Sequence, residues 1–272
     1  MAEPVTSAKT IVVRGNAAHD GVRAVPEETA IAVVLNGSTQ AVMMATPADL
    51  EDFAVGFALS EGIVAGPDEI EGLEVVEQQG GIEARLWLAA ERAEAVAARR
   101  RAMAGPVGCG LCGIESLAEA LRPLPPVGAG STLSVADVDR AVNEIAAKQA
   151  MNARTRAVHA AGLFLPERGV VLVREDVGRH NALDKLAGAA ARGGVDGSGG
   201  AVVITSRVSV EMVQKCAMAG VPVLIAVSAP TAHALRLAEA AGITLVAIAR
   251  GDGFEIFTHP ERIGRGEQTH VA

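Results

Sequence analysis

Residues 201–250, AVVITSRVSVEMVQKCAMAGVPVLIAVSAPTAHALRLAEAAGITLVAIAR, decide the fold of this chain. Three apolar runs rich in β-branched residues alternate here with two segments in which apolar residues recur at helical spacing. The predicted strands are 201–205, 222–227 and 244–249, and the predicted helices are 208–219 and 231–241. Regular strand–helix alternation is typical of a mainly parallel sheet with helices packed on it.

The same pattern extends upstream. Strands are expected at 159–165 and 169–174, with a helix at 179–191, and Ser134 is expected to cap a long helix that reaches about residue 151. A Pro/Gly-rich stretch, LRPLPPVGAGS, precedes that helix and is typical of a domain boundary. We therefore expect a three-layer α/β domain over residues 129–272.

Residues 1–128 predict a separate domain of mixed α and β structure. Two apolar runs, Thr29–Asn36 and Thr39–Ala45, are joined by Gly37 and Ser38 and predict a hairpin. Thr46, followed by proline, is expected to cap a helix. Two further strands are expected within residues 72–88.

Composition restricts the function. The chain has 272 residues, of which 50% are hydrophobic, and a formal net charge of −8. This acidity argues against a broad nucleic-acid or anionic-membrane surface. No apolar stretch approaches the roughly 20 residues that span a bilayer, and the first residues, MAEPVTSAKT, do not resemble a signal peptide, so a cytoplasmic protein is expected. In that reducing compartment the three cysteines are not expected to form a disulfide framework.

Polar residues gather just after the predicted strands. In an open α/β sheet, ligands bind outside the carboxyl ends of parallel strands, where helix N-termini also favour anions. Guanidinium groups there would suit phosphate. We therefore predict a pocket for a phosphorylated, nucleotide-like ligand, although strand-to-helix loops are polar in most proteins. The residues concerned are Arg174, Asp176, Arg179, Arg207, Ser228, Arg250 and Asp252.

Two acidic residues and one histidine in these loops have alternative interpretations. Asp176 or Asp252 could accept hydrogen bonds from the donor-rich edge of guanine, or could be an ordinary turn residue. His180, with Asp184 one helical turn later, could perform acid–base chemistry or could belong to a plain surface helix.

Cys109-Gly-Leu-Cys112 is the sharpest chemical feature of the chain. It lies in AGPVGCGLCG (104–113), whose four glycines would let the loop move and approach another surface. Two thiols at this spacing before a helix favour a thiolate. The pair could exchange disulfides, bind zinc with two further ligands, or carry a terminal sulfur as a persulfide. Residue chemistry does not separate the carrier from the redox dithiol, although the glycines favour the carrier.

A zinc-dependent nucleobase deaminase is excluded by motif order. That mechanism needs His-x-Glu before Pro-Cys-x-x-Cys, whereas His159 is followed by Ala161 at the glutamate position and comes after the cysteine pair. No metal site is expected. The remaining cysteine, Cys216, is expected to be a buried small apolar residue, and Glu211 and Lys215 are expected to form an ordinary i, i+4 pair.

The chain resembles the FdhD family of accessory sulfurtransferases of formate dehydrogenases. The resemblance runs in order over about residues 30–263. Its segments are TPADLEDFAVGFALSEGI (46–63), GCGLCG (108–113), REDVGRHNALDK (174–185), SRVSVEMVQKCAMAGVPVLIAVSAPT (206–231) and ARGDGFEIFTHPERI (249–263).

The resemblance implies a function, a site and partners. It implies that sulfur from a cysteine desulfurase is carried as a persulfide on Cys109, with Cys112 assisting, and passed to the molybdenum bis(molybdopterin guanine dinucleotide) cofactor of a formate dehydrogenase. GDP would mimic part of that cofactor. It also implies a cytidine-deaminase-like second domain without zinc, and a homodimer. The guanine nucleotide would be bound by Ile248, Ala249, Arg250, Gly251, Asp252 and Gly253. A cofactor chaperone that transfers no sulfur and a dithiol oxidoreductase are the alternatives.

One segment departs from the family pattern. The family usually has Gly-Gly before the histidine of the His-Ala-Ala segment, whereas this chain has Arg156 and Ala157 before Val158 and His159. The extra side chains would either narrow the pocket or alter a turn.

Overall fold

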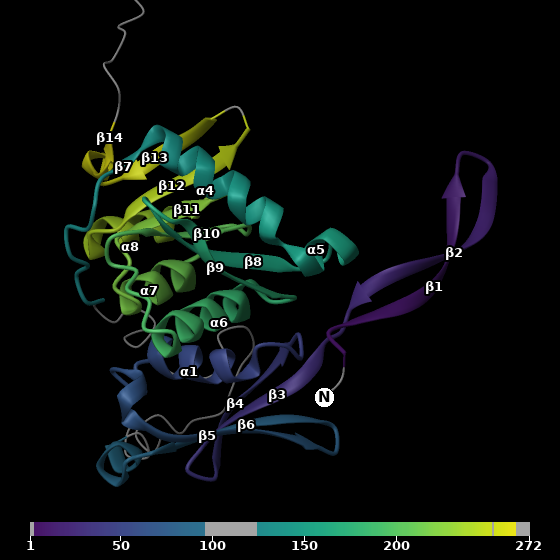
Figure 1. Ribbon diagram of the computed structural model, residues 1–272, viewed down its shortest axis with the longest axis horizontal. Helices are drawn as coiled ribbons and strands as arrows, with labels where there is room; N and C mark the ends of the chain where they lie inside the picture. The colour runs from purple at the N-terminus through teal and green to yellow at the C-terminus, as the bar shows by residue number, and fades with distance from the viewer. Residues whose placement is uncertain (1–2, 96–123, 252, 265–272) are drawn as a thin grey trace, which may run out of the picture.

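The computed structural model describes residues 3–95, 124–251 and 253–264. Figure 1 shows three parts: a sheet of β8 to β13 with its helices, a smaller sheet of β3 to β6 with one helix, and a hairpin that projects from the body. The Cys109–Cys112 pair, with the whole of the loop 104–113, and Asp252 lie outside the described residues.

The larger domain contains a six-stranded sheet in the order β13-β12-β11-β10-β8-β9. Strands β10, β11 and β12 are parallel neighbours, whereas β8 pairs antiparallel with both β10 and β9, and β13 pairs antiparallel with β12. Four strands (β9 to β12) therefore share one direction, and β8 and β13 oppose it. The α/β prediction is confirmed for residues 201–250, but three of the five ladders are antiparallel, so the sheet is mixed. The strands are β8 (His159–Leu165), β9 (Gly169–Asp176), β10 (Ala201–Ile204), β11 (Val223–Ala226), β12 (Thr244–Arg250) and β13 (Gly253–Thr258).

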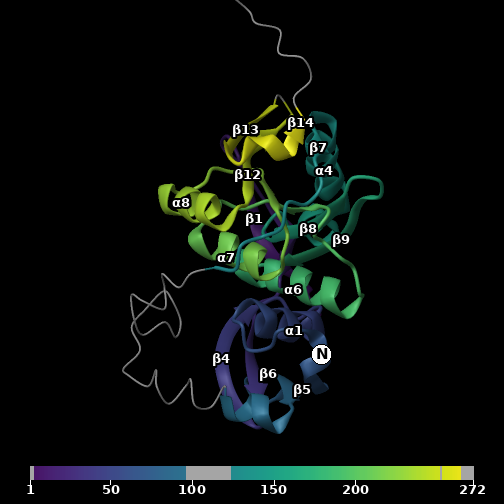
Figure 2. The same cartoon turned by 90° about the vertical axis from the view of Figure 1, so that its left-hand side faces the viewer.

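Helices cover both faces of this sheet, which gives the three expected layers (Figures 1 and 2). On one face, α4 (Val135–Lys148) packs Val138, Ala141 and Ile145 on side chains of every strand from β8 to β12. Ser134 caps α4 as predicted, and a short α5 (Ala150–Thr155) follows. The other face carries α6 (Arg179–Arg192), α7 (Val210–Met218) and α8 (Ala232–Ala241).

The first domain is built on a four-stranded sheet in the order β4-β3-β6-β5. Its strands are β3 (Thr29–Leu35), β4 (Ser38–Ala45), β5 (Ile70–Gln78) and β6 (Gly81–Leu88), and α1 (Leu50–Ser60) buries Phe53, Ala54 and Ala58 against them. The predicted hairpin is confirmed, but its turn lies one residue earlier than the expected Gly37 and Ser38, because Ser38 already begins β4. Its turn is made by Asn36 and Gly37, which both have positive φ, as the favoured two-residue hairpin turn requires.

The two domains meet where α1 crosses α6, and the contact depends on two glycines. A Cβ atom at Gly56 would lie 1.7 Å from the carbonyl oxygen of Asp184, and one at Gly188 would lie 1.9 Å from that of Asp52. No side chain fits in that space. Asp52 also bridges the domains through Arg174, at 2.7 Å, and Arg192.

Two buried lysines complete this interface. Lys185 is fully buried, lies 2.6 Å from Asp176 and donates a hydrogen bond to the carbonyl of Thr46 at 2.9 Å. Lys215 bonds Asp184 at 2.7 Å and Ser60 at 2.9 Å.

These contacts correct two sequence predictions. Thr46 does not cap α1, which begins at Leu50 after Asp49; its hydroxyl instead accepts a bond from the amide of Val177, 131 positions away. The main partner of Lys215 is Asp184 and not Glu211. Both residues were assigned to local motifs, but they hold the two domains together.

The hairpin of β1 (Val5–Arg14) and β2 (Ala17–Pro26) extends away from both sheets (Figure 1). The middle of its strands presents Ile11 and Val22, which are 69% and 73% exposed. Near its base, Arg23 reaches the carbonyl of Thr155 in α5 at 3.4 Å.

The segment that leads into α4 belongs to the larger domain. The amide of Val127 bonds the carbonyl of Ala241, and β7 (Leu133–Ser134) pairs with β14 (Ile263–Gly264). Among the described residues, no helix combines the length and apolarity needed to cross a membrane.

Candidate functional site

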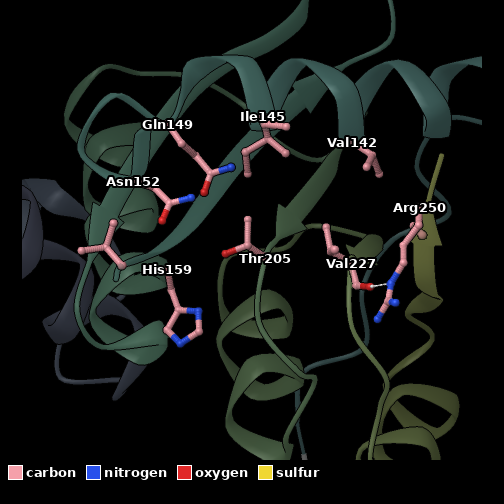
Figure 3. Close-up of a pocket in the computed structure, with 11 residues that line it drawn as sticks. Val142, Ile145, Gln149, Asn152, His159, Thr205, Val227 and Arg250 are labelled. Carbon is pink, nitrogen blue, oxygen red and sulfur yellow. Dashed lines mark hydrogen bonds between the residues drawn. The ribbon is translucent and has the colours of Figure 1, made fainter. Parts of the chain in front are cut away.

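A pocket of about 430 Å³ lies at the carboxyl ends of the central strands (Figure 3). Because β10, β11 and β12 run in one direction, the residues that end them or follow them, Thr205, Val227 and Arg250, meet along this edge. Strand β8 runs the other way, so its first residue, His159, arrives at the same edge. The pocket therefore lies outside the carboxyl ends of the parallel strands, the position that was predicted from the order of strands and helices.

The opposite wall comes from α4 and α5. Val142, Ile145 and Ala146 line the pocket from α4, and Gln149 and Asn152 follow at the junction with α5. In Figure 3 the two carboxamides lie at the His159 end, while Arg250 lies at the other end. The pocket thus has an apolar middle, an uncharged polar end and a cationic end.

The end of β12 is strained in a way that shapes the cationic end. Ile248 has a φ of 55°, a left-handed conformation that a β-branched residue rarely adopts. The register with β13 shifts between Ala247 and Arg250, and the amide of Ile248 bonds the carbonyl of Ser228 at 3.3 Å. Such strain costs about 1–3 kcal/mol and is concentrated at functional sites. Here it brings Ala249 and Arg250 to the pocket, where Nε of Arg250 donates to the carbonyl of Val227 at 3.3 Å.

Of the other predicted phosphate-binding residues, Arg179, Arg207 and Ser228 lie around the same edge but do not line the pocket, whereas Arg174 bonds Asp52 at the domain interface. Arg207 is exposed in the loop after β10, and Ser228 follows β11. Arg179 begins α6, and its buried Nε has no hydrogen-bond partner within the described residues. Gly251 and Gly253, on either side of residue 252, are exposed beyond β12.

Asp176 does not face the pocket. Its carboxylate is fully buried and, besides Lys185, accepts hydrogen bonds from the amides of Thr46 and Gly178 and from the side chain of Asn181. Every lone-pair direction of the carboxylate is therefore used inside the protein. We assign Asp176 to the domain interface. Of the two interpretations offered by the sequence, the structural one therefore fits better than the guanine ligand.

The two histidines near the edge are held neutral. Burial lowers the pKa of His159, and the positive charge of Arg179 lowers it further, while Asp176 acts in the opposite direction. Burial likewise lowers the pKa of His180 to about 4, with Arg179 adding to the effect and Glu211 opposing it. His180 makes no hydrogen bond to Asp184 in the described part of the chain, and the carboxylate of Asp184 is occupied by Lys215 and Ser60. The suggested His180–Asp184 acid–base pair is therefore not formed.

The third cysteine is unreactive. Cys216 is fully buried in α7, and burial raises the pKa of its thiol to about 12. This confirms its prediction as a small core residue. Within the described residues, no three His, Cys, Asp or Glu side chains are close enough together to hold a metal ion.

Sequence reasoning missed Gln149 and Asn152. They lie in AAKQAMNAR (146–154), where polar residues near a helix end have no distinctive motif. Arg156, by contrast, explains the departure from the Gly-Gly pattern. It ends α5 with a φ of 55°, the conformation that glycine adopts without strain, and it is exposed outside the pocket. The turn is retained and the pocket is not narrowed.

These features define an α/β protein with a pocket at the carboxyl edge of a mixed sheet. The family model described as FdhD/NarQ matches residues 26–264, and the chain belongs to that family. It is 55% identical over 244 residues to the sulfur carrier protein FdhD of Agrobacterium fabrum, covering 89% of this chain and 90% of that one. It is 56% identical over 242 residues to the protein of the same name from Brucella abortus, with 89% and 90% covered.

A solved structure supports the fold. The crystal structure of a candidate formate dehydrogenase accessory protein from Desulfotalea psychrophila matches with a TM-score of 0.77 at 28% identity. It covers 96% of this chain and 99% of that one.

Proposed function

We propose that this protein is a sulfur carrier, a sulfurtransferase that holds sulfur as a persulfide on Cys109 and delivers it for formate dehydrogenase maturation. The observation that carries the proposal is the inert state of Cys216. Of the three cysteines in the chain, this one is fully buried with its thiol pKa raised to about 12, so reactive sulfur chemistry is left to Cys109 and Cys112. The names of the relatives support the same role.

Loading is a thiol exchange without net oxidation. The Cys109 thiolate attacks the outer sulfur of a persulfide on a cysteine desulfurase. A new S–S bond forms on Cys109, the S–S bond of the donor breaks, and the donor leaves as a thiolate. Cys112 assists but is not needed to hold the sulfur.

The recipient is the molybdenum bis(molybdopterin guanine dinucleotide) cofactor, bound as a client through its nucleotide. Arg250 suits a phosphate, and the pocket beside it is large enough for part of a nucleotide. The loops of Arg207, Ser228 and residues 248–253 would surround that phosphate. We further propose that the protein acts in the cytoplasm as a homodimer, with the desulfurase and the formate dehydrogenase as its partners.

Intact mass tests the carrier. After incubation with a cysteine desulfurase and cysteine, the protein should gain the mass of one sulfur atom, which a reductant removes, on the peptide that contains Cys109. Cys109→Ser should abolish the gain and the maturation of formate dehydrogenase, whereas Cys216→Ser, the matched control, should retain both. A wild-type protein that matures the enzyme without gaining sulfur would instead be a cofactor chaperone. Mass loss by two hydrogens alone would indicate a dithiol oxidoreductase.

GDP tests the pocket. A ligand that binds only the folded state raises the melting temperature. GDP should do so, and Arg250→Ala should weaken its binding by about 1–3 kcal/mol, the usual value of a charge-assisted contact. Sulfur loading should be unchanged in that variant. No shift at millimolar GDP would refute a nucleotide pocket.

A further inference from the structure

The carboxamides of Gln149 and Asn152 have no hydrogen-bond partner in the part of the chain that the structure describes. Gln149 is only 8% exposed, and no side-chain hydrogen bond of either residue occurs within the described residues. Their backbones are fixed: the carbonyl of Gln149 accepts from the amide of Ala153, and the amide of Asn152 donates to Glu175 at 2.8 Å. The buried side-chain atoms without a partner among the described residues are Arg179 Nε and Ser209 Oγ, so the carboxamide of Gln149 is accessible from the pocket, where a ligand can bond it.

Both carboxamides line the pocket and lie at the same end of it (Figure 3). His159 lies at this end too, and its ring makes no hydrogen bond within the described residues. None of these three side chains carries a charge when the histidine is neutral. Each carboxamide offers both donors and an acceptor. The middle of the pocket is apolar, formed by Val142, Ile145 and Val227 among others.

The arrangement of an uncharged polar end, an apolar middle and a cationic end matches a flat heterocycle with a phosphate tail. Apolar side chains suit the faces of a ring, uncharged donors and acceptors suit its edge, and a guanidinium suits the phosphate. Guanine presents donors at N1 and at its amino group and an acceptor at its oxygen, which two carboxamides can satisfy together. Arg250, at the far end, cannot serve the same edge.

Resting on the nucleotide pocket proposed above, we infer that Gln149 and Asn152 bind the edge of the guanine ring, with Arg250 on its phosphates. The ring therefore enters toward the junction of α4 and α5, and the segment from residue 248 contacts the phosphate side of the nucleotide. Selection of the base does not need Asp176, whose carboxylate is used at the domain interface.

The test compares near-isosteric variants of the full-length protein. Gln149→Met and Asn152→Leu keep side-chain size and remove the carboxamide. Calorimetric titration should show GDP affinity about ten-fold weaker in each variant, the loss expected from one hydrogen bond. Affinity for inorganic pyrophosphate, which has no ring, should change less than two-fold. Gln78→Met, at the exposed end of β5, is the matched control and should bind both probes like the wild type.

Stability supplies a second measurement. Because the carboxamide that Gln149→Met removes makes no hydrogen bond within the described residues, the melting temperature of the unliganded variant should stay close to that of the wild type, while its GDP-induced shift decreases. If one variant fails to fold, the other decides the question. GDP binding at wild-type strength, or equal loss of GDP and pyrophosphate, would overturn the inference and leave the pocket in place. Failure of the wild type to bind GDP would reject the nucleotide pocket itself.

Discussion

Replacing Lys185 with methionine should destabilise the protein by about 3–5 kcal/mol. Methionine occupies nearly the same volume, so little packing is lost. The carboxylate of Asp176, however, stays fully buried without the cation that lies 2.6 Å from it, and the carbonyl of Thr46 loses a donor. Removing one partner of a buried pair typically has this cost. The three N–H groups that still bond Asp176 favour the lower part of the range.

Urea unfolding followed by far-ultraviolet circular dichroism measures this difference. Lys9→Met, on the exposed hairpin, is the matched control and should change stability by less than about 0.5 kcal/mol. Adding Asp176→Asn to Lys185→Met removes the uncompensated charge, so the double variant should be more stable than the sum of the single effects predicts by at least about 1 kcal/mol. A loss below 1 kcal/mol in Lys185→Met, or strict additivity, would show that the pair does not hold the interface as described.

Three further changes test other parts of the structure. Gly188→Ala should destabilise the protein by about 1–2 kcal/mol in urea unfolding, because a Cβ 1.9 Å from the carbonyl of Asp52 forces the helices apart, and the free energy lost exceeds what the better helix propensity of alanine gains. Gly128→Ala, with open space around it, is the control and should leave stability unchanged. Equal effects of the two substitutions would contradict the close approach. Arg156→Gly should stabilise by roughly 0.5–1 kcal/mol, since glycine relieves the left-handed strain, and a lower melting temperature would contradict this. The pKa of His180 is lowered to about 4 in the folded state, so between pH 6.5 and 4 the imidazole of His180 is protonated in the unfolded chain but not in the folded one. The contribution of His180 to stability should therefore be complete above pH 6.5 and decrease below it, by at most about 1.4 kcal/mol per pH unit. The decrease should be smaller in His180→Gln. An unchanged slope in that variant would assign the effect to other groups.

The elements of the larger domain could be predicted because their signals are local. Strand 244–249 and helix 231–241 agree with β12 and α8 to within one residue at each end, since apolar runs, caps and glycines fix them. The direction of β8 and β13 could not be derived in this way, because strand pairing depends on connections and not on composition.

The site was predicted less completely, for physical reasons. The position of the pocket could be predicted from the order of strands and helices, and Ala249 and Arg250 line it. The role of Asp176 depends on Thr46, 130 positions away, and no local pattern reports such a contact. The left-handed backbone of Ile248 contradicts local preference, so only the fold reveals it.

The contact between α1 and α6 leaves the two domains no intermediate separation. Glycine-to-carbonyl packing leaves no room for sliding. Parting the helices would take Thr46 and Ser60 away from the two buried lysines and would break the bonds of Asp52 to Arg174 and Arg192. Opening the interface would therefore lose all of these contacts together. The domains should melt in one transition, and the pocket should keep its shape while a client arrives and leaves.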